Sequence, residues 1–181
     1  MMNDDSAFTW LRLDDEALLG QCREERYRAG GPGGQRRNKV ETAVRLHHLP
    51  SGVTAQAEES RSHQENRLRA LRRLRLRIAL EVRSPLDLEA PVLRPELLAQ
   101  RAAQGRLAVN PRNQAYPIIL ATALDALQSA QGSYATAARA LGLTTSQFVR
   151  LLRSDAEVWR QVSEARGDDL AGSGSGRRPV R

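Results

Sequence analysis

The stretch that is most informative about the fold is residues 30–71, which read GGPGGQRRNKVETAVRLHHLPSGVTAQAEESRSHQENRLRAL. Its first six residues cannot form a stable helix or strand, because glycine loses the most backbone entropy on ordering and has no side chain to pack. Gly33 and Gly34 permit positive φ angles, so we expect Gln35 at the exposed tip of a loop. A polar, mostly basic segment follows the loop directly: Arg36, Arg37, Asn38 and Lys39.

Regular structure is predicted on both sides of this loop. Residues 40–49 alternate between two faces as a strand does, residues 50–52 are typical of a turn, and residues 53–57 predict a return strand. Together they predict an antiparallel hairpin. Before the loop, residues 22–29 predict a half-exposed strand with Tyr27 packed inward.

A long helix is predicted from residues 60–62 to about residue 82, with Ser62 and Glu65 spaced as a capping box. One apolar face should pack on the hairpin, and it consists of Leu71, Leu74, Ile78 and Val82. The rest of the surface should carry arginines almost unrelieved by acids: Arg67, Arg69, Arg72, Arg73, Arg75 and Arg77. This surface is either a solvated face or an RNA backbone contact, and the second is favoured because a solvated face normally mixes signs.

The segments that flank this region are predicted to be short elements. Residues 8–13 alternate loosely and predict an opening strand, and residues 14–16 should cap a short helical turn. The three prolines of residues 84–95 indicate a linker at residues 84–94, after which helices are expected at residues 95–104 and 110–130.

The C-terminal part resembles a helix-turn-helix of bacterial DNA-binding regulators over residues 133–152. Gly142 should end the first helix, and Thr144, Thr145 or Ser146 should cap the second. A helical hairpin that packs only on its neighbours is the alternative. A last helix is expected at residues 155–162 with Trp159 closing the small core. Residues 167–181 should form a flexible basic tail.

Composition limits the function classes. The formal net charge of +7 and pI near 10.8 indicate a polyanionic partner, with nucleic acid favoured over a membrane.

Cys22 is the only cysteine, so no intrachain disulfide is possible, and it is expected to be a small core residue. No leader or membrane span is evident, so we expect a cytoplasmic protein that has no membrane partner. His47 and His48 should point to opposite faces of a strand, so no metal site is expected.

Several segments in order resemble the peptidyl-tRNA hydrolysis domain of class I peptide chain release factors. These segments are Gly-Gly-Gln at residues 33–35, Asn-Lys at 38–39, His-x-Pro-x-Gly at 48–52 and Ser-x-x-x-Asn-Arg at 62–67. The likeness covers about residues 10–83. It implies an α+β fold, in which a small antiparallel sheet packs on a long helix and carries an exposed GGQ loop. Residues 1–83 would form this domain, and residues 95–166 a small all-α domain.

The resemblance also implies a mechanism, a monomer and no cofactor. Gly33, Gly34 and Gln35 would enter the ribosomal peptidyl transferase centre and act on peptidyl-tRNA. There the backbone amide of Gln35 would stabilise the transition state, and its side chain would exclude nucleophiles other than water. Gln35 is a candidate for side-chain methylation, as in relatives. The chain itself shows no Ser-His-Asp set and no carboxylate pair beside the loop, which agrees with catalysis by a backbone amide.

The closer likeness is to short, codon-independent factors that free stalled ribosomes, since few residues precede the loop. Two features depart from that pattern: Arg36 and Arg37 stand where the family more often has an uncharged residue and valine, and a helical region stands where a long basic tail is usual. The residues expected to contact rRNA or mRNA are Arg36, Arg37, Asn38, Lys39, Arg61, Arg67, Arg69, Arg72, Arg73, Arg139, Arg150 and Arg153. The alternatives are a DNA-binding regulator with a non-catalytic first domain, and a ribosome-binding factor that has lost release activity.

Overall fold

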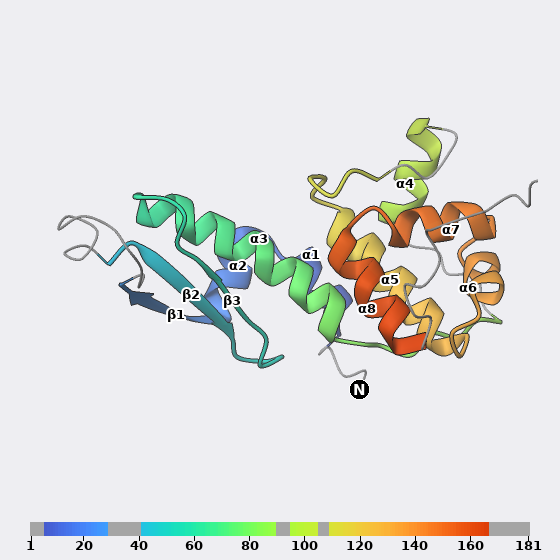
Figure 1. Cartoon of the computed structure of the whole chain (residues 1–181), viewed down its shortest axis with the longest axis horizontal. Helices are drawn as coiled ribbons and strands as arrows, with labels where there is room; N and C mark the ends of the chain where they lie inside the picture. The colour runs from blue at the N-terminus through green and yellow to red at the C-terminus, as the bar shows by residue number, and fades with distance from the viewer. Residues whose placement is uncertain (1–5, 29–40, 90–94, 105–108, 167–181) are drawn as a thin grey trace, which may run out of the picture.

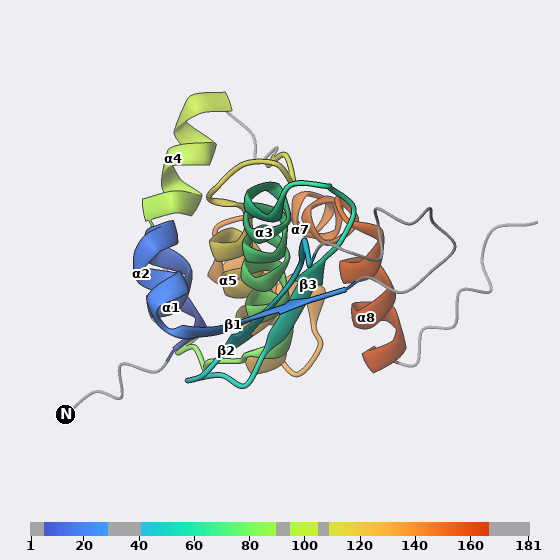
Figure 2. The ribbon, with the colours of Figure 1, turned by 90° about the vertical axis from the view of Figure 1, so that its left-hand side faces the viewer.

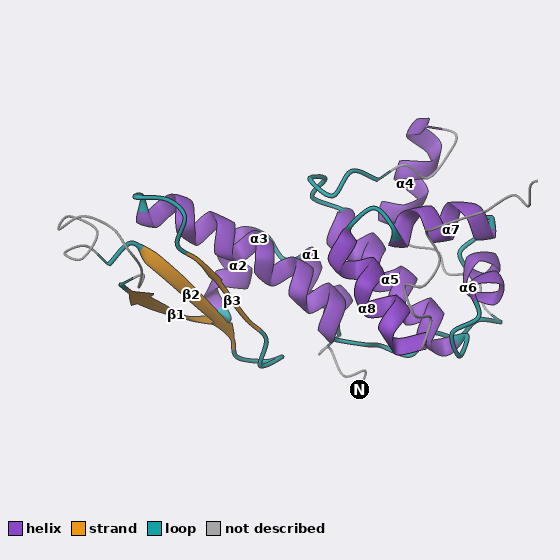
Figure 3. Cartoon of the chain, in the orientation of Figure 1, coloured by secondary structure: helices purple, strands orange, loops and turns teal. Residues whose placement is uncertain are grey.

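The computed structural model describes residues 6–28, 41–89, 95–104 and 109–166. A small antiparallel sheet with one long helix lies at one end of the molecule, and a group of helices lies at the other (Figure 1). Colouring by secondary structure shows the same division, with all described strands at the sheet end (Figure 3). The predicted α+β fold is therefore confirmed.

The N-terminal segment is helical, so the strand predicted at residues 8–13 is wrong. Helix α1 (Ala7–Arg12) begins after Ser6, whose side chain accepts a hydrogen bond from the Thr9 amide. Trp10 and Leu11 lie three and four residues after Ala7, and all three are buried, which is the spacing of a helix face. Helix α2 (Asp15–Gly20) follows with Asp14 as its cap, as predicted.

The sheet contains β1 (Cys22–Tyr27), β2 (Ala43–His48) and β3 (Thr54–Ala57) in the order β1-β2-β3. Both pairings are antiparallel, with Tyr27 opposite Ala43 and His47 opposite Thr54. The predicted hairpin is thus confirmed, although β2 begins at Ala43 and the expected residue Val40 lies outside the described residues. Gly52 has φ of +71°, a left-handed conformation that suits glycine, and closes the turn.

Helix α3 (His63–Glu81) packs on β2 and β3 and confirms the predicted long helix. Ser62 caps it by accepting from the Glu65 amide. Glu65 accepts from the Ser60 hydroxyl at 2.6 Å, so the structure shows one half of the expected capping box. The buried face carries Leu71, Leu74 and Ile78, while Val82 follows the helix as its partly buried C-cap. Viewed from the sheet end, α3 lies alongside the three strands (Figure 2).

Arg75 does not lie on the solvent face that its neighbours form, which corrects the expectation from sequence. Its side chain is buried, and its guanidinium donates to the carbonyls of Leu11 at 3.1 Å and Leu13 at 2.8 Å. It also donates to Asp15 Oδ1 at 2.9 Å. Arg75 therefore joins the end of α1 and the start of α2 to α3, and these bonds satisfy a charge that would be costly to bury alone.

The remaining helices are α4 (Pro95–Gln104), α5 (Tyr116–Ser129), α6 (Tyr134–Ala140), α7 (Thr145–Leu152) and α8 (Ala156–Arg166). α5 is buried over almost its whole length and contacts α1, α3, α6 and α7. The helix predicted at residues 110–130 starts later than expected. Asn110 and Asn113 instead accept hydrogen bonds from the backbone two residues on and form turns before α5. The partly buried Trp159 on α8 packs against the core, as predicted.

The segment after α3 runs along α5. Asp125 Oδ1 accepts from Arg83 Nη1 and from the Ser84 amide, each at 3.0 Å, and Ser129 Oγ accepts from the Leu86 amide at 2.9 Å. Buried residues from α1, α3 and α5 form one hydrophobic cluster. The division into two domains with a linker at residues 84–94 stays a prediction. Among the described residues, no helix is both long enough and apolar enough to cross a membrane.

Candidate functional site

The glycine-rich stretch connects the ends of two neighbouring antiparallel strands. β1 ends at Tyr27, β2 begins at Ala43, and these two residues face each other in the ladder. The predicted loop residues lie outside the described residues: Gly33, Gly34, Gln35, Arg36, Arg37, Asn38 and Lys39. The candidate site is therefore described by the strand ends and by the contacts that hold them.

Charged and aromatic side chains are paired at these strand ends. Arg28 Nε lies 3.2 Å from Glu41 Oε1, so an ion pair joins the last described residue before the gap to the first one after it. The Tyr27 hydroxyl donates to Glu58 Oε2 at 3.2 Å, and the Arg45 guanidinium stacks over the Tyr27 ring. Burial and the Glu58 carboxylate raise the pKa of Tyr27, so its phenol stays protonated and acts as a donor.

Asn66 ties the start of β2 to the start of α3. It is fully buried in the first turns of α3, and its Nδ2 donates to the Thr42 carbonyl at 2.7 Å and to the Ser60 carbonyl at 2.8 Å. Its Oδ1 accepts from the Ser60 amide at 2.9 Å. One side chain thus satisfies three backbone groups from two segments, and we name these contacts the Asn66 clamp.

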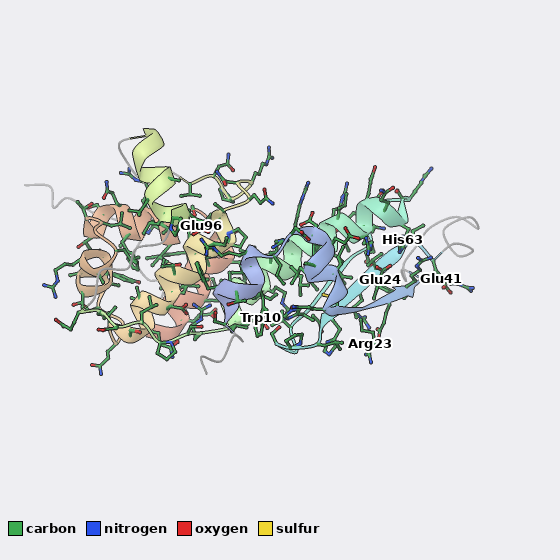
Figure 4. The ribbon with its side chains drawn as sticks, turned by 180° about the vertical axis from the view of Figure 1, so that it is seen from behind. Trp10, Arg23, Glu24, Glu41, His63 and Glu96 are labelled. Carbon is green, nitrogen blue, oxygen red and sulfur yellow. The ribbon has the colours of Figure 1, made fainter. Side chains whose placement is uncertain are left out.

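Glu24 on β1 is a second connection between the sheet and α3. Its carboxylate accepts from His63 Nε2 at 2.9 Å and from Arg67 Nε at 2.7 Å, and Arg26 lies 3.7 Å away. Burial alone would raise the pKa of Glu24, but Arg67 and His63 outweigh burial and hold the pKa below its ordinary value. Glu24, His63 and Glu41 lie near one another at the sheet end, far from Glu96 on α4 (Figure 4).

The His-x-Pro-x-Gly motif forms the turn at the opposite end of β2. His48 is fully buried, and its ring meets Trp10 edge to face with centroids 4.9 Å apart. Its Nδ1 lies 2.6 Å from Ser51 Oγ and its Nε2 lies 3.1 Å from Gln21 Oε1. Since the amide oxygen only accepts, Nε2 carries the proton. Burial, with a smaller effect of His47, lowers the pKa of His48, so this histidine is a neutral structural residue.

The arginines predicted to contact RNA on and before α3 are not equivalent. Arg67 is held by Glu24, and Arg73 bonds both Glu59 and the Gln56 carbonyl. Arg69 lies 3.8 Å from Glu65. Arg61 and Arg72 are exposed and have no carboxylate partner among the residues that the structure describes. The expectation that this face carries arginines with almost no acidic partners is therefore wrong. The carboxylates come mainly from the sheet and from the segment between β3 and α3.

The other predicted arginines lie on a separate part of the molecule. Arg139 is on α6, Arg150 is on α7 and Arg153 is its C-cap, and all three are exposed. α6 and α7 lie at the end of the molecule opposite the sheet (Figure 1). The structure therefore separates these residues from the strand ends at the glycine-rich stretch.

Two residues of the site were assigned no role from sequence. Asn66 belongs to the Ser-x-x-x-Asn-Arg pattern, so the pattern itself was the signal for the clamp. Glu24 lay in a polar strand with no local partner, and its contacts with His63 and Arg67 arise only when α3 packs across the sheet. Cys22 gave no sign of reactivity, and burial raises the pKa of its thiol to about 11.

Curated relatives match the part of the chain that holds this site. Peptide chain release factor 1 of Chloroherpeton thalassium is 52% identical over 66 residues, which is 36% of this chain and 18% of the relative. Its namesake from Chlorobaculum tepidum is 49% identical over 67 residues, covering 34% of this chain and 19% of the relative. Peptide chain release factor 2 of an Acidovorax species is 40% identical over 77 residues, covering 40% and 21%. The chain thus spans about a fifth of the length of these relatives.

A family model identifies the same region over a longer span. The model of the RF-1 domain matches residues 18–114, which is more than half of the 181 residues and includes the whole sheet, the glycine-rich stretch and α3. The chain therefore belongs to the RF-1 domain family, the GGQ domain family of class I peptide chain release factors.

Proposed function

We propose that this protein hydrolyses peptidyl-tRNA on the ribosome, with residues 33–35 inserted into the peptidyl transferase centre. The observation that carries the proposal is the position of Gly33-Gly34-Gln35 in the connection between β1 and β2 of an RF-1 domain. The ion pair of Arg28 with Glu41 and the Asn66 clamp support it, because they fix both strands that lead into this connection.

The chemistry follows from a backbone donor. Water attacks the ester carbonyl carbon of peptidyl-tRNA, and negative charge develops on the carbonyl oxygen. The ester C–O bond then breaks, the peptide leaves with a free carboxyl group, and a proton from the attacking water is transferred to the ribose oxygen. The backbone amide of Gln35 donates a hydrogen bond to this developing charge. Removing one such donor in other enzymes costs about 10²–10³ in rate. The described ionisable groups at the strand ends are engaged with one another, so they support a role in holding the strands rather than in proton transfer.

A finer proposal is that release needs no stop codon. It rests on the likeness to short rescue factors, and it is tested on ribosomes that hold peptidyl-tRNA in three states: an mRNA that ends in the P site, a stop codon in the A site, or a sense codon there. Release from the first state without need of a stop codon is expected. Release restricted to the stop codon would contradict the finer proposal alone.

The same assay tests the main proposal with a matched pair of variants. Gln35→Pro removes the backbone N–H donor and should lower the release rate by about 10²–10³, whereas Gln35→Ala keeps this donor and should lower the rate much less. Gln64→Ala removes an exposed glutamine on α3 and should release peptide at the wild-type rate. No release by the wild type in any ribosomal state would overturn the proposal.

A DNA-binding regulator is the second candidate function. The observation that favours it is the pair α6 and α7, joined by a turn in which Gly142 has φ of +64° and Thr144 caps α7. Such a pair is the arrangement of a helix-turn-helix. Under this alternative, Gln35→Ala would leave binding to a DNA target unchanged, and the wild type would release no peptide.

A further inference from the structure

The arginines that carry no internal ion pair are unevenly distributed in this structure. Most described arginine side chains face a carboxylate, including Arg12 with Glu96 at 2.7 Å and Arg160 with Glu157 at 2.5 Å. Among the described residues, the following have no carboxylate partner: Arg61, Arg72, Arg112, Arg139, Arg150 and Arg153. Half of these are Arg139 on α6, Arg150 on α7 and Arg153 at the C-cap of α7, so these two helices hold the largest group of such arginines among the described residues.

α6, α7 and the turn between them contain no acidic residue. No acidic residue occurs between Asp125 and Asp155, in a chain that has 21 acidic residues in 181. Within this span Arg139, Arg150 and Arg153 are exposed. A solvated helix surface normally mixes signs, so a surface of one sign indicates a partner of the opposite sign.

Packing orders this surface. Ala137 and Ala138 on α6 are buried, as are Phe148, Leu151 and Leu152 on α7, so the exposed sides of both helices are determined by the core. The Arg153 guanidinium lies 4.4 Å from the centroid of the Trp159 ring on α8. This stacking limits the rotamers of Arg153, so less entropy is lost when its guanidinium donates to a phosphate.

We infer that Arg139, Arg150 and Arg153 form a surface that binds the phosphate backbone of RNA. We name these three residues the α6–α7 surface. The two α7 residues lie at the C-terminal end of that helix, whereas base reading by a DNA-binding helix-turn-helix uses the N-terminal residues of the second helix. The arrangement therefore suits backbone contacts. RNA is chosen as the partner on the basis of the proposed ribosomal function.

The inference changes which part of the chain is expected to hold RNA. On α3, Arg67 and Arg73 are engaged with Glu24 and Glu59, so a phosphate would have to compete with a carboxylate there. At the α6–α7 surface no such competition exists among the described residues. A phosphate contact there releases counterions and costs no internal ion pair.

The test compares two full-length variants that each lose three positive charges. The first is Arg139→Gln, Arg150→Gln and Arg153→Gln. The second neutralises three exposed arginines that are paired with glutamates: Arg23, Arg77 and Arg160. Binding of a short fluorescein-labelled RNA duplex, and of a DNA duplex of the same sequence, is measured by anisotropy over a salt series.

The two variants should differ in salt dependence. Each phosphate contact contributes about 0.7–0.9 to the slope of log K against log salt, so the first variant should lose about 2 to 3 units of slope. Between about 50 mM and about 200 mM salt, wild-type binding should therefore fall about 15-fold to 40-fold more than binding by this variant. The paired-arginine variant should keep most of the wild-type slope.

Three results would overturn the inference: equal effects of the two variants, no effect of the first, or binding to DNA more than tenfold tighter than to RNA. Because Arg153 contacts Trp159, the double variant Arg139→Gln and Arg150→Gln serves as a second test that leaves this contact in place. Its slope should fall by about two thirds of the amount expected for the triple variant. The anisotropy assay measures RNA binding and does not depend on peptidyl-tRNA hydrolysis. If the wild type binds RNA but releases no peptide in the ribosomal assay, the proposed function is contradicted and this inference still stands.

Discussion

Replacing Asn66 by alanine should destabilise the protein more than any exposed substitution near it. The change removes the Nδ2 donor to the Thr42 and Ser60 carbonyls and the Oδ1 acceptor for the Ser60 amide. Each such bond contributes about 1 kcal/mol net, and an unsatisfied buried group costs about 1–3 kcal/mol. Thr42 and Ser60 are partly accessible to water, so we expect a total loss of about 3 kcal/mol.

The measurement is the free energy of unfolding from urea titrations, together with the midpoint of thermal unfolding. For a chain of this size, a loss of about 3 kcal/mol corresponds to a fall in Tm of roughly 6–12 °C. Gln64→Ala is the matched control, because Gln64 is exposed on the same turn of α3, and its change should stay within about 0.5 kcal/mol.

A second substitution separates the hydrogen bonds from the shape of the side chain. Asn66→Asp keeps the size and the acceptor but places a carboxylate against two carbonyl oxygens, which would raise its pKa in the folded protein. A raised folded pKa means that the folded state binds the proton more tightly, so Asn66→Asp should regain stability, relative to wild type, as pH falls from about 7 to about 5. The reasoning is refuted if Asn66→Ala unfolds within about 1 kcal/mol of wild type.

Two further predictions concern His48 and Arg75. The pKa of His48 in the folded protein is lowered from 6.5, so the unfolded chain binds the proton first and stability should fall as pH drops below about 6.5. The slope is at most about 1.4 kcal/mol per pH unit. It should be missing in His48→Gln when urea unfolding is measured between about pH 5 and about pH 7. A His48→Gln variant with the wild-type slope would disprove it. Arg75→Leu should lower the free energy of unfolding by about 2–4 kcal/mol, because two carbonyls and Asp15 lose their donor, while Arg72→Leu on the exposed face should change it by less than about 0.5 kcal/mol; similar losses in both would show that the buried bonds contribute nothing.

The sequence was sufficient to predict the sheet and α3, because their signals are local. Alternation marks β2, Pro50 and Gly52 mark its turn, and Ser62 marks the start of the helix. The segment at residues 8–13 was predicted as a strand because six residues are too few to separate a period of two from a period of 3.6. Ser6 stabilises the helix by accepting a hydrogen bond from the Thr9 amide, and this bond exists only once the helix has formed.

The environment of Arg75 was partly encoded in the sequence. Leu71, Leu74, Arg75 and Ile78 lie at i, i+3, i+4 and i+7, so position 75 belongs to the buried face by spacing alone. The positive charge of Arg75 favoured a position on the surface. It is buried because its guanidinium donates to carbonyls about sixty residues earlier in the chain. The partners of Arg67 and Arg73 also lie outside α3, 43 and 14 residues earlier in the chain, so spacing within the helix could not show that this part of it is neutralised.

The inferred RNA contact at the α6–α7 surface would give the helical region a part in placing the β1–β2 connection. Arg83 and Ser84 both donate to Asp125, and Leu86 donates to Ser129, so the segment that leaves α3 is fixed on α5 rather than free to swing. An RNA contact at the α6–α7 surface would therefore orient α3 and the sheet as well, since α5 contacts both α3 and α6. On this view α3 needs few free arginines, because most of the orientation comes from the opposite end of the molecule.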